Sequence, residues 1–302
     1  MTTTKLDALF ERAETLIDHL ETLLPPPPQA VDWNGALAFK WRGAAHPCKL
    51  SGLRISRKLR LEDMRCIDRQ KNRLVRNTRQ FMQDLPANNA LLWGSRGTGK
   101  SSLIKALLNE YAGAGLRLIE VDPQHLHELP DILDLLTQRP EKFILYCDDL
   151  SFEANDGQYK TLKAVLEGSV AELGRNVLIY ATSNRRHLLP EFQSENQQAR
   201  YLPGNQDQCE LHHGDSVEEK ISLSERFGLW LSFHPFNQEE YLEIIRYWLQ
   251  QLGADDTFEQ ARAGALRFAL ERGSRSGRVA WQFARDHVGQ AALDKIDEAE
   301  QS

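Results

Sequence analysis

LLWGSRGTGKSS, residues 91–102, is the stretch of this 302-residue chain that decides its fold. Residues 94–101 match the pattern G-x-x-x-x-G-K-[ST], in which glycines let backbone amides turn inward around phosphate oxygens. A helix that begins at this loop adds the positive end of its dipole. We expect Lys100 to reach the terminal phosphates of a nucleotide and Ser101 to offer its hydroxyl to Mg²⁺. The predicted phosphate-binding residues are Gly94, Ser95, Arg96, Gly97, Thr98, Gly99, Lys100, Ser101 and Ser102.

Short apolar runs alternate with helical patterns on both sides of this loop. Helices are predicted over 67–84 and 100–112. Apolar strands that alternate with helices indicate a parallel sheet that is covered on both faces. The sequence therefore predicts an α/β fold with a five-stranded parallel sheet, whose strands are expected at 90–93, 116–122, 143–149, 176–184 and 228–236.

The N-terminal segment is predicted to form a separate helical arm. Residues 5–24 carry apolar side chains at helical spacing, which predicts an amphipathic helix. Four prolines, residues 25–28, end it, because proline lacks the amide donor that a helix needs. The arm packs either on its own chain or on a neighbouring subunit. No strand or helix is assigned between about residues 29 and 60.

From residue 237 onward the pattern is only helical. Asn237 and Glu240 have the spacing of a capping box, and Gly253 is typical of a helix end. Two more helices are predicted at about 256–272 and 277–291. The chain thus divides into an N-terminal arm with a proline-rich linker, a nucleotide-binding α/β domain and a small C-terminal helical lid domain, over residues 1–59, 60–236 and 237–302.

Carboxylates follow the apolar run FILYC, residues 143–147. Asp148 is expected at the carboxyl end of this strand, where it would hold Mg²⁺ through water. Asp149 comes next and would orient or deprotonate an attacking water. Glu153, in the segment SFE, is a second candidate for the same role.

Three further polar residues are candidates for the chemistry of phosphoryl transfer. Asn184 ends the run IYATSN, where it either holds the nucleophilic water or is an ordinary turn residue. Arg226 in SLSERFG precedes a strand, and Arg278 begins the last helix. A guanidinium stabilises charge on a transferring phosphoryl group, although an isolated surface arginine more often forms a simple ion pair.

These motifs, in this order and followed by a helical lid, resemble the AAA+ ATPases over about residues 60–291. The resemblance implies that 94–101 is Walker A and 143–149 is Walker B. It assigns Asn184 to sensor 1, Arg226 to the arginine finger and Arg278 to sensor 2. The segment CIDRQKNRLVRN is similar to the one that packs around adenine, which implies that Ile67 contacts the base. Walker B ends in Asp-Asp rather than the commoner Asp-Glu, as in the bacterial replication initiator and helicase-loader branch.

At finer grain, the motifs look like one family of uncharacterised bacterial AAA+ ATPases that carries a domain-of-unknown-function label. The stretches that carry this likeness are IDRQK, PANNALLWGSRGTGKSSLIKALLNEYA, LRLIEVD, CDDLSFE, YATSNRRHLLPE and EEKISLSERFG. The resemblance implies ATP and Mg²⁺ as cofactors. It also implies a homo-oligomer that hydrolyses ATP between subunits to remodel a protein partner, which it does not identify.

The charge distribution supports a second hypothesis, that the protein associates with nucleic acid. The chain has a formal net charge of −6, yet between residues 40 and 81 thirteen Lys/Arg stand against three Asp/Glu. Such a block either meets nucleic acid or an acidic partner, or it is a solvated helix face. A nucleic-acid-associated ATPase and an ATP-binding switch with little hydrolysis are therefore alternatives. A small-molecule kinase is disfavoured by Asn184 and by the C-terminal helices.

The remaining composition indicates the cytoplasm. Four cysteines fit no zinc ribbon or redox motif. No apolar run approaches the ~20 residues of a membrane span, and the N-terminus lacks the apolar core of a signal peptide. We therefore expect no membrane partner.

Overall fold

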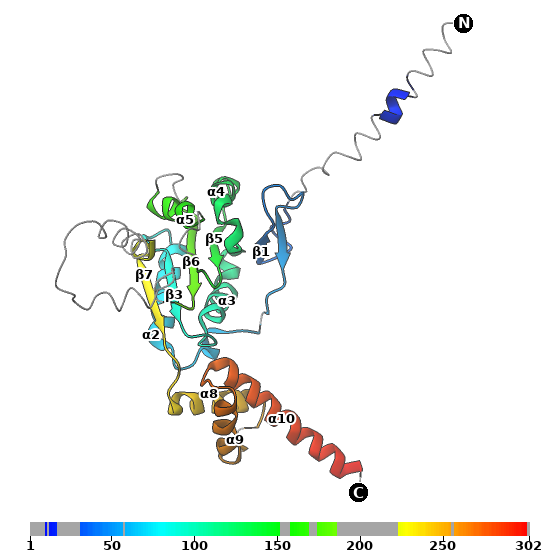
Figure 1. Cartoon of the computed structure of the whole chain (residues 1–302), viewed down its shortest axis with the longest axis vertical. Coiled ribbons are helices and arrows are strands. Elements are labelled where there is room, and N and C mark those ends of the chain that lie inside the picture. Colours follow the sequence, from blue (N-terminus) through cyan, green and yellow to red (C-terminus); the bar gives the residue numbers. More distant parts are fainter. Residues whose placement is uncertain are drawn as a thin grey trace, which may run out of the picture.

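The computed structural model describes residues 10, 12–16, 31–56, 58–151, 158–168, 174–185, 223–254 and 257–300. In this part of the chain a seven-stranded sheet is flanked by helices, and the C-terminal helices lie beyond one end of its strands (Figure 1). Residues 12–16 of the predicted arm are helical, whereas the rest of the arm apart from Phe10 lies outside the described residues. None of the described helices is long and apolar enough to cross a membrane.

The sheet has seven strands and not the predicted five. All five predicted strands are present, and each parallel pair between them leaves the carboxyl ends at one edge. They are β3 (Ala90–Gly94), β4 (Leu116–Glu120), β5 (Lys142–Cys147), β6 (Val177–Ser183) and β7 (Leu229–Phe233). The full strand order is β2-β1-β4-β5-β6-β3-β7.

The two additional strands come from the segment that the sequence left unassigned. β1 (Ala38–Trp41) pairs in parallel with β4, and β2 (Leu50–Leu53) pairs antiparallel with β1 at the edge of the sheet. Each has four residues, which is too short for a periodic signal. The sequence of β2, LSGL, also includes a glycine, which weakens strand preference.

The sheet is covered on both faces, as alternation of strands and helices predicted. Helices α2 (Asp68–Met82) and α3 (Lys100–Tyr111) pack on one face, where Leu74 and Leu107 join a buried cluster with Ile144 of β5. Helices α4 (Leu129–Leu136) and α5 (Gln158–Glu167) pack on the other face, where Leu162 meets a cluster with Leu145. Successive residues of a strand point to opposite faces, so β5 is apolar throughout its buried length.

The C-terminal helices are α8 (Gln238–Gln251), α9 (Phe258–Glu271) and α10 (Gly277–Glu300). The predicted capping box is present: Asn237 Oδ1 accepts from the Glu240 amide at 2.9 Å, and Glu240 Oε2 accepts from the Asn237 amide at 2.8 Å. α10 is longer than predicted, since it continues past residue 291. The group packs through buried side chains such as Ile245 and Ala284 and sits at the carboxyl ends of the strands (Figure 1).

Candidate functional site

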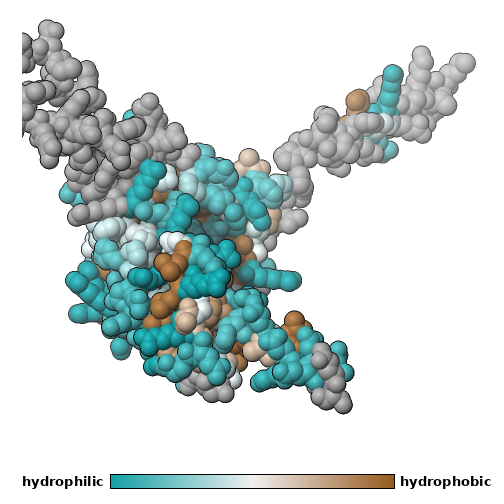
Figure 2. All heavy atoms as spheres, turned by 60° about the horizontal axis from the view of Figure 1, so that its bottom comes forward, coloured by the Kyte–Doolittle hydropathy of each residue, from teal (hydrophilic) through white to brown (hydrophobic). Residues whose placement is uncertain are grey.

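A cavity of about 1060 Å³ opens between the carboxyl ends of the strands and the C-terminal helices. Its lining comes from the loop at 96–102, the segment before α2, the ends of β5 and β6, and helices α8 and α10. Figure 2 turns this end of the molecule toward the reader and shows hydrophobic residues gathered among a mostly hydrophilic surface. The volume is at the upper end of the range for pockets that enclose small molecules.

The loop after β3 is shaped by glycines that no other residue can replace without strain. Gly94 has φ 131°, and a β-carbon there would lie 1.9 Å from the Phe233 carbonyl oxygen. Gly97 has φ 75°, and its β-carbon would lie 2.8 Å from Ser276 Oγ. The loop leads directly into α3, which begins at Lys100. The strand, loop and helix that a phosphate cradle requires are therefore all in place.

Seven of the nine predicted phosphate-binding residues line the cavity: Arg96, Gly97, Thr98, Gly99, Lys100, Ser101 and Ser102. The other two, Gly94 and Ser95, support the loop from behind. Their carbonyl oxygens accept hydrogen bonds from Lys100 Nζ at 2.6 and 2.8 Å.

Lys100, the first residue of α3, is a buried cation that is only 7% exposed. Besides the two loop carbonyls, its Nζ donates to Asn184 Oδ1 at 3.2 Å. Burial lowers the pKa of Lys100 to about 8, against the opposing effect of Asp149 and Asp148, and the positive charge of Arg96 and Arg278 adds to the lowering. A desolvated ammonium of this kind interacts strongly with any anion that enters the loop.

Asp148 and Ser101 meet at the edge of the cavity. Ser101 Oγ donates to Asp148 Oδ1 at 2.9 Å, and Thr182 Oγ1 donates to the same oxygen at 2.6 Å. Burial alone would raise the pKa of Asp148, but the hydrogen bonds from Thr182 and Ser101 outweigh it, so the pKa lies below its usual value. The result is an ionised carboxylate beside a hydroxyl, a pair of hard oxygen ligands that suits Mg²⁺.

Asp149 lines the same cavity and is connected to Asn184. The Asn184 side-chain amide donates to Asp149 Oδ1, and the Arg96 guanidinium lies 3.6 Å from the other carboxylate oxygen. The Asp149 amide donates to Thr182 Oγ1 at 2.9 Å, which fixes the backbone of Asp149 in the left-handed region with φ 50°. The structure thus brings Asp149, Asn184 and Lys100 together. Glu153 lies outside the described residues.

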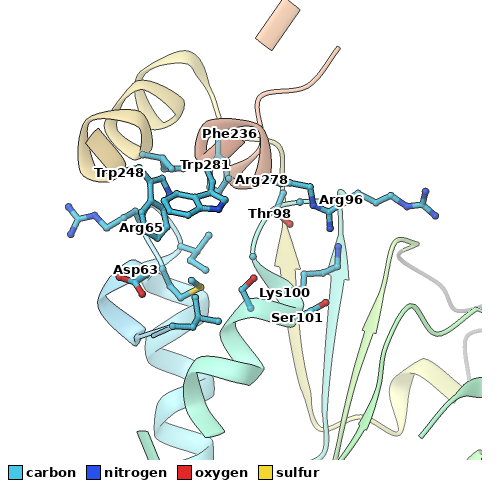
Figure 3. A pocket seen from close by; sticks show the side chains of 18 of the residues that line it. Asp63, Arg65, Arg96, Thr98, Lys100, Ser101, Phe236, Trp248, Arg278 and Trp281 are labelled. Carbon is cyan, nitrogen blue, oxygen red and sulfur yellow. The ribbon is translucent and has the colours of Figure 1, made fainter. Parts of the chain in front are cut away.

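The far end of the cavity contains a pair of tryptophans, with Asp63 and Arg65 on the same side (Figure 3). The rings of Trp248 on α8 and Trp281 on α10 have centroids 4.5 Å apart and planes tilted by 56°. Ile67, predicted to contact a base, lines the cavity together with Met64, and both side chains lie beside Gly99 of the loop. Figure 3 shows the tryptophans on one side of the cavity and Lys100 and Ser101 on the other.

The sequence analysis missed this tryptophan pair. Neither Trp248 nor Trp281 was predicted to lie in the site. Thr182, which holds Asp148, was not predicted either. Its position on β6, next to β5, was the available signal for that contact.

The two predicted arginines have different positions. Arg278 lines the cavity, and its amide donates to the Gly97 carbonyl at 3.3 Å, so the start of α10 touches the loop. Arg226 is not among the described residues that line this cavity. It precedes β7, at the amino ends of the strands, and its Nε donates to Glu167 Oε1 of α5 at 2.6 Å.

Comparison with known proteins assigns the chain to a family. Residues 34–291 match the family described as "Protein of unknown function (DUF815)". No curated protein matches the chain.

Two solved structures are similar over most of the chain. A single-substitution variant of RuvB from Thermotoga maritima has a TM-score of 0.53 and 16% identity, and the match covers 79% of this chain and 67% of that one. The AAA domain of FIGL-1 in complex with ADP has a TM-score of 0.51 and 13% identity, with 82% and 79% covered. At these identities the likeness shows the fold alone, an α/β fold like that of AAA+ ATPase domains.

Proposed function

Since the chain belongs to DUF815, a family of unknown function, we propose from the site itself that it binds ATP with Mg²⁺ and hydrolyses the ATP between the subunits of a homo-oligomer. The energy remodels a bound macromolecular partner. In this proposal residues 60–236, together with β1 and β2 of the same sheet, form the nucleotide-binding domain, 237–302 the lid domain, and the segment before β1 an accessory arm and linker.

The observation that carries the proposal is the convergence of three surfaces in one cavity. The loop around Lys100 offers a cradle for phosphates, the oxygens of Asp148 and Ser101 offer ligands for Mg²⁺, and the tryptophan pair offers a stacking surface for a base. Bound Mg²⁺ supplies positive charge that offsets the negative charge of the phosphates. A nucleoside triphosphate is the common ligand that needs all three surfaces at once.

In the proposed hydrolysis each site residue has its own role. Lys100 and the loop amides bind and orient the phosphates, and Arg278 adds charge from α10. Asp149 accepts the proton of the attacking water, with Asn184 holding the carboxylate and the water in line. Glu153 is the second candidate for the base. The arginine of the neighbouring subunit, Arg226, completes the charge stabilisation.

The acid pair tests this division of roles. Asp148→Asn is expected to weaken Mg²⁺-dependent ATP binding, because a neutral amide is a poorer ligand for a hard cation. Asp149→Asn should leave ATP affinity within about twofold and slow turnover by ~10²-fold or more, because the proton acceptor is lost. Equilibrium binding of a fluorescent ATP analogue and steady-state phosphate release measure the two effects separately.

Other outcomes for the carboxylate variants would point to a different base or to binding without hydrolysis. If Glu153→Gln alone stops turnover, Glu153 is the base. If Asp149→Asn and Glu153→Gln both turn over like the parent protein, the hydrolytic proposal is wrong and ATP acts as a binding switch. Asp131→Asn, an exposed carboxylate on α4, is the matched control and should change neither quantity.

The pH dependence of ATP affinity follows from Lys100. Because its pKa is about 8 in the free protein, Lys100 loses its charge above that pH, whereas bound phosphates favour the charged form. Binding at higher pH must therefore take up a proton, and affinity should fall by up to about tenfold per pH unit above about 8. Calorimetry in buffers of different ionisation enthalpy detects the proton. Lys100→Arg keeps its charge, so any binding that it retains should lack this dependence.

A further inference from the structure

A stripe of four arginines runs along the exposed face of α2, outside the cavity. Its members, spaced as i, i+4, i+7 and i+10, fall on one side of the helix: Arg69, Arg73, Arg76 and Arg79. The opposite side of α2 is anchored in the core by Leu74 and Phe81. We call this surface the α2 stripe.

Among the described residues, the α2 stripe lacks the ion pairs that other cations of this region form. Lys71 pairs with Asp68 at 2.8 Å, and Arg65 pairs with Glu243 at 3.0 Å. Within the described part of the chain, none of the four stripe arginines forms an ion pair, and Arg73 donates to a carbonyl, that of Trp230, at 3.4 Å. Like charges at these spacings repel and reduce helix stability.

The helix that carries the stripe is firmly held. Gln70 Nε2 donates to the Ser232 carbonyl at 2.8 Å, and Asn77 Nδ2 donates to the Asn88 carbonyl at 2.8 Å. The Asn77 amide also donates to the buried Tyr180 hydroxyl at 3.0 Å. The guanidinium groups therefore project from a fixed line about 15 Å long, at the helical rise of about 1.5 Å per residue.

We propose that the α2 stripe binds the sugar–phosphate backbone of double-stranded DNA. Guanidinium groups match phosphate oxygens better than ammonium groups do, and the stripe cations of α2 are all arginines, while the one lysine of this helix is paired. A duplex is a stiff, dense polyanion that fits a straight, rigid row of positive charge. The only aromatic residue of α2, Phe81, is buried, so the stripe offers unpaired bases no stacking surface.

The position of α2 connects this surface to the nucleotide site. α2 begins immediately after Met64 and Ile67, which line the cavity, and shares a buried cluster with α3, the helix that carries Lys100. DNA on the stripe thus contacts a helix that follows one part of the cavity lining in the chain and packs with the helix that carries another part. The inference rests on the proposed function only for this connection, because DNA binding itself is measured without nucleotide.

Fluorescence anisotropy of a labelled duplex tests the inference with the full chain. The parent protein should bind a duplex of about 30 base pairs at ~50 mM salt, with affinity that falls steeply as salt rises. The double variant Arg69→Glu/Arg76→Glu should lose about tenfold or more of that affinity. It should also reduce the slope of log affinity against log salt by about 2, one unit for each phosphate that the variant no longer neutralises.

The matched control is Arg262→Glu/Arg267→Glu, which makes the same charge change at exposed positions of α9. It should keep at least half of the parent affinity and slope. Three results would each overturn the DNA assignment. The two double variants could lose the same affinity, or the protein could bind a single strand more tightly than the duplex. Poly-glutamate could also displace the labelled duplex as well as an unlabelled duplex does. ATPase activity without DNA should be the same in the parent and both variants, which separates this result from any failure of the ATPase proposal.

Discussion

Arg226→Ala is expected to bind ATP normally and to hydrolyse it ~10³-fold more slowly, because the transition-state charge loses a guanidinium from the neighbouring subunit. The structure motivates the experiment by placing Arg226 outside the cavity of its own chain, beside Glu167 of α5. A residue at the amino ends of the strands cannot serve a site at their carboxyl ends unless a second copy brings the two together. Phosphate release and binding of a fluorescent ATP analogue measure turnover and affinity.

Mixing two inactive variants distinguishes action between subunits from a local effect. Arg226→Ala has an intact cradle, and Lys100→Ala has an intact Arg226, so mixed oligomers contain some complete interfaces and should regain part of the activity. Arg262→Ala, a change at an exposed arginine of α9, is the control and should behave like the parent. A protein that stays monomeric with ATP and shows no rescue would contradict hydrolysis between subunits.

Lys100→Ala is expected to lower ATP affinity by about 10- to 100-fold, the effect of losing a charge-assisted hydrogen bond in a site where water is scarce. The lysine already makes two hydrogen bonds to the carbonyls of Gly94 and Ser95 and one to Asn184, which follows β6, so its loss also loosens the loop. Calorimetric titration with ATP and Mg²⁺ gives the affinity. Circular dichroism verifies that the variant is folded.

Lys295→Ala provides the comparison for that measurement. Lys295 is an exposed lysine near the end of α10, far along the chain from the loop, and its removal should leave affinity unchanged. If Lys100→Ala binds ATP as tightly as Lys295→Ala does, the loop around Lys100 does not hold phosphates.

The sequence predicted the central sheet well because its signals are local. Strands β3 to β7 are largely apolar runs beside helices with clear periodicity, so each could be recognised by itself. β1 and β2 were missed because strands of only four residues carry no such pattern. The end of α10 was placed too early because residues 292–300 are exposed and favour a helix by composition rather than by an apolar stripe.

The sequence predicted which candidate residues lie together where a motif fixes their spacing along the chain. The loop at 94–101 and Asp148 depend only on a strand end and its neighbours, and the structure places them together. The tryptophan pair depends on two helices packing, and the Arg226–Glu167 contact depends on two elements meeting at the opposite end of the sheet. Contacts of that kind come from tertiary packing, which spacing in one sequence does not encode.

The contact between Gly97 and the start of α10 links the phosphate loop to one end of a long helix. α10 has 24 residues, so it is about 36 Å long at the usual helical rise, and its first turn rests on the phosphate loop. If α10 tilted by only about 10° about its first turn, its C-terminal end would move by about 6 Å. Leu293 and Ile296, both more than half exposed, sit near that end, so a small tilt of the first turn would move these two apolar side chains by several ångströms.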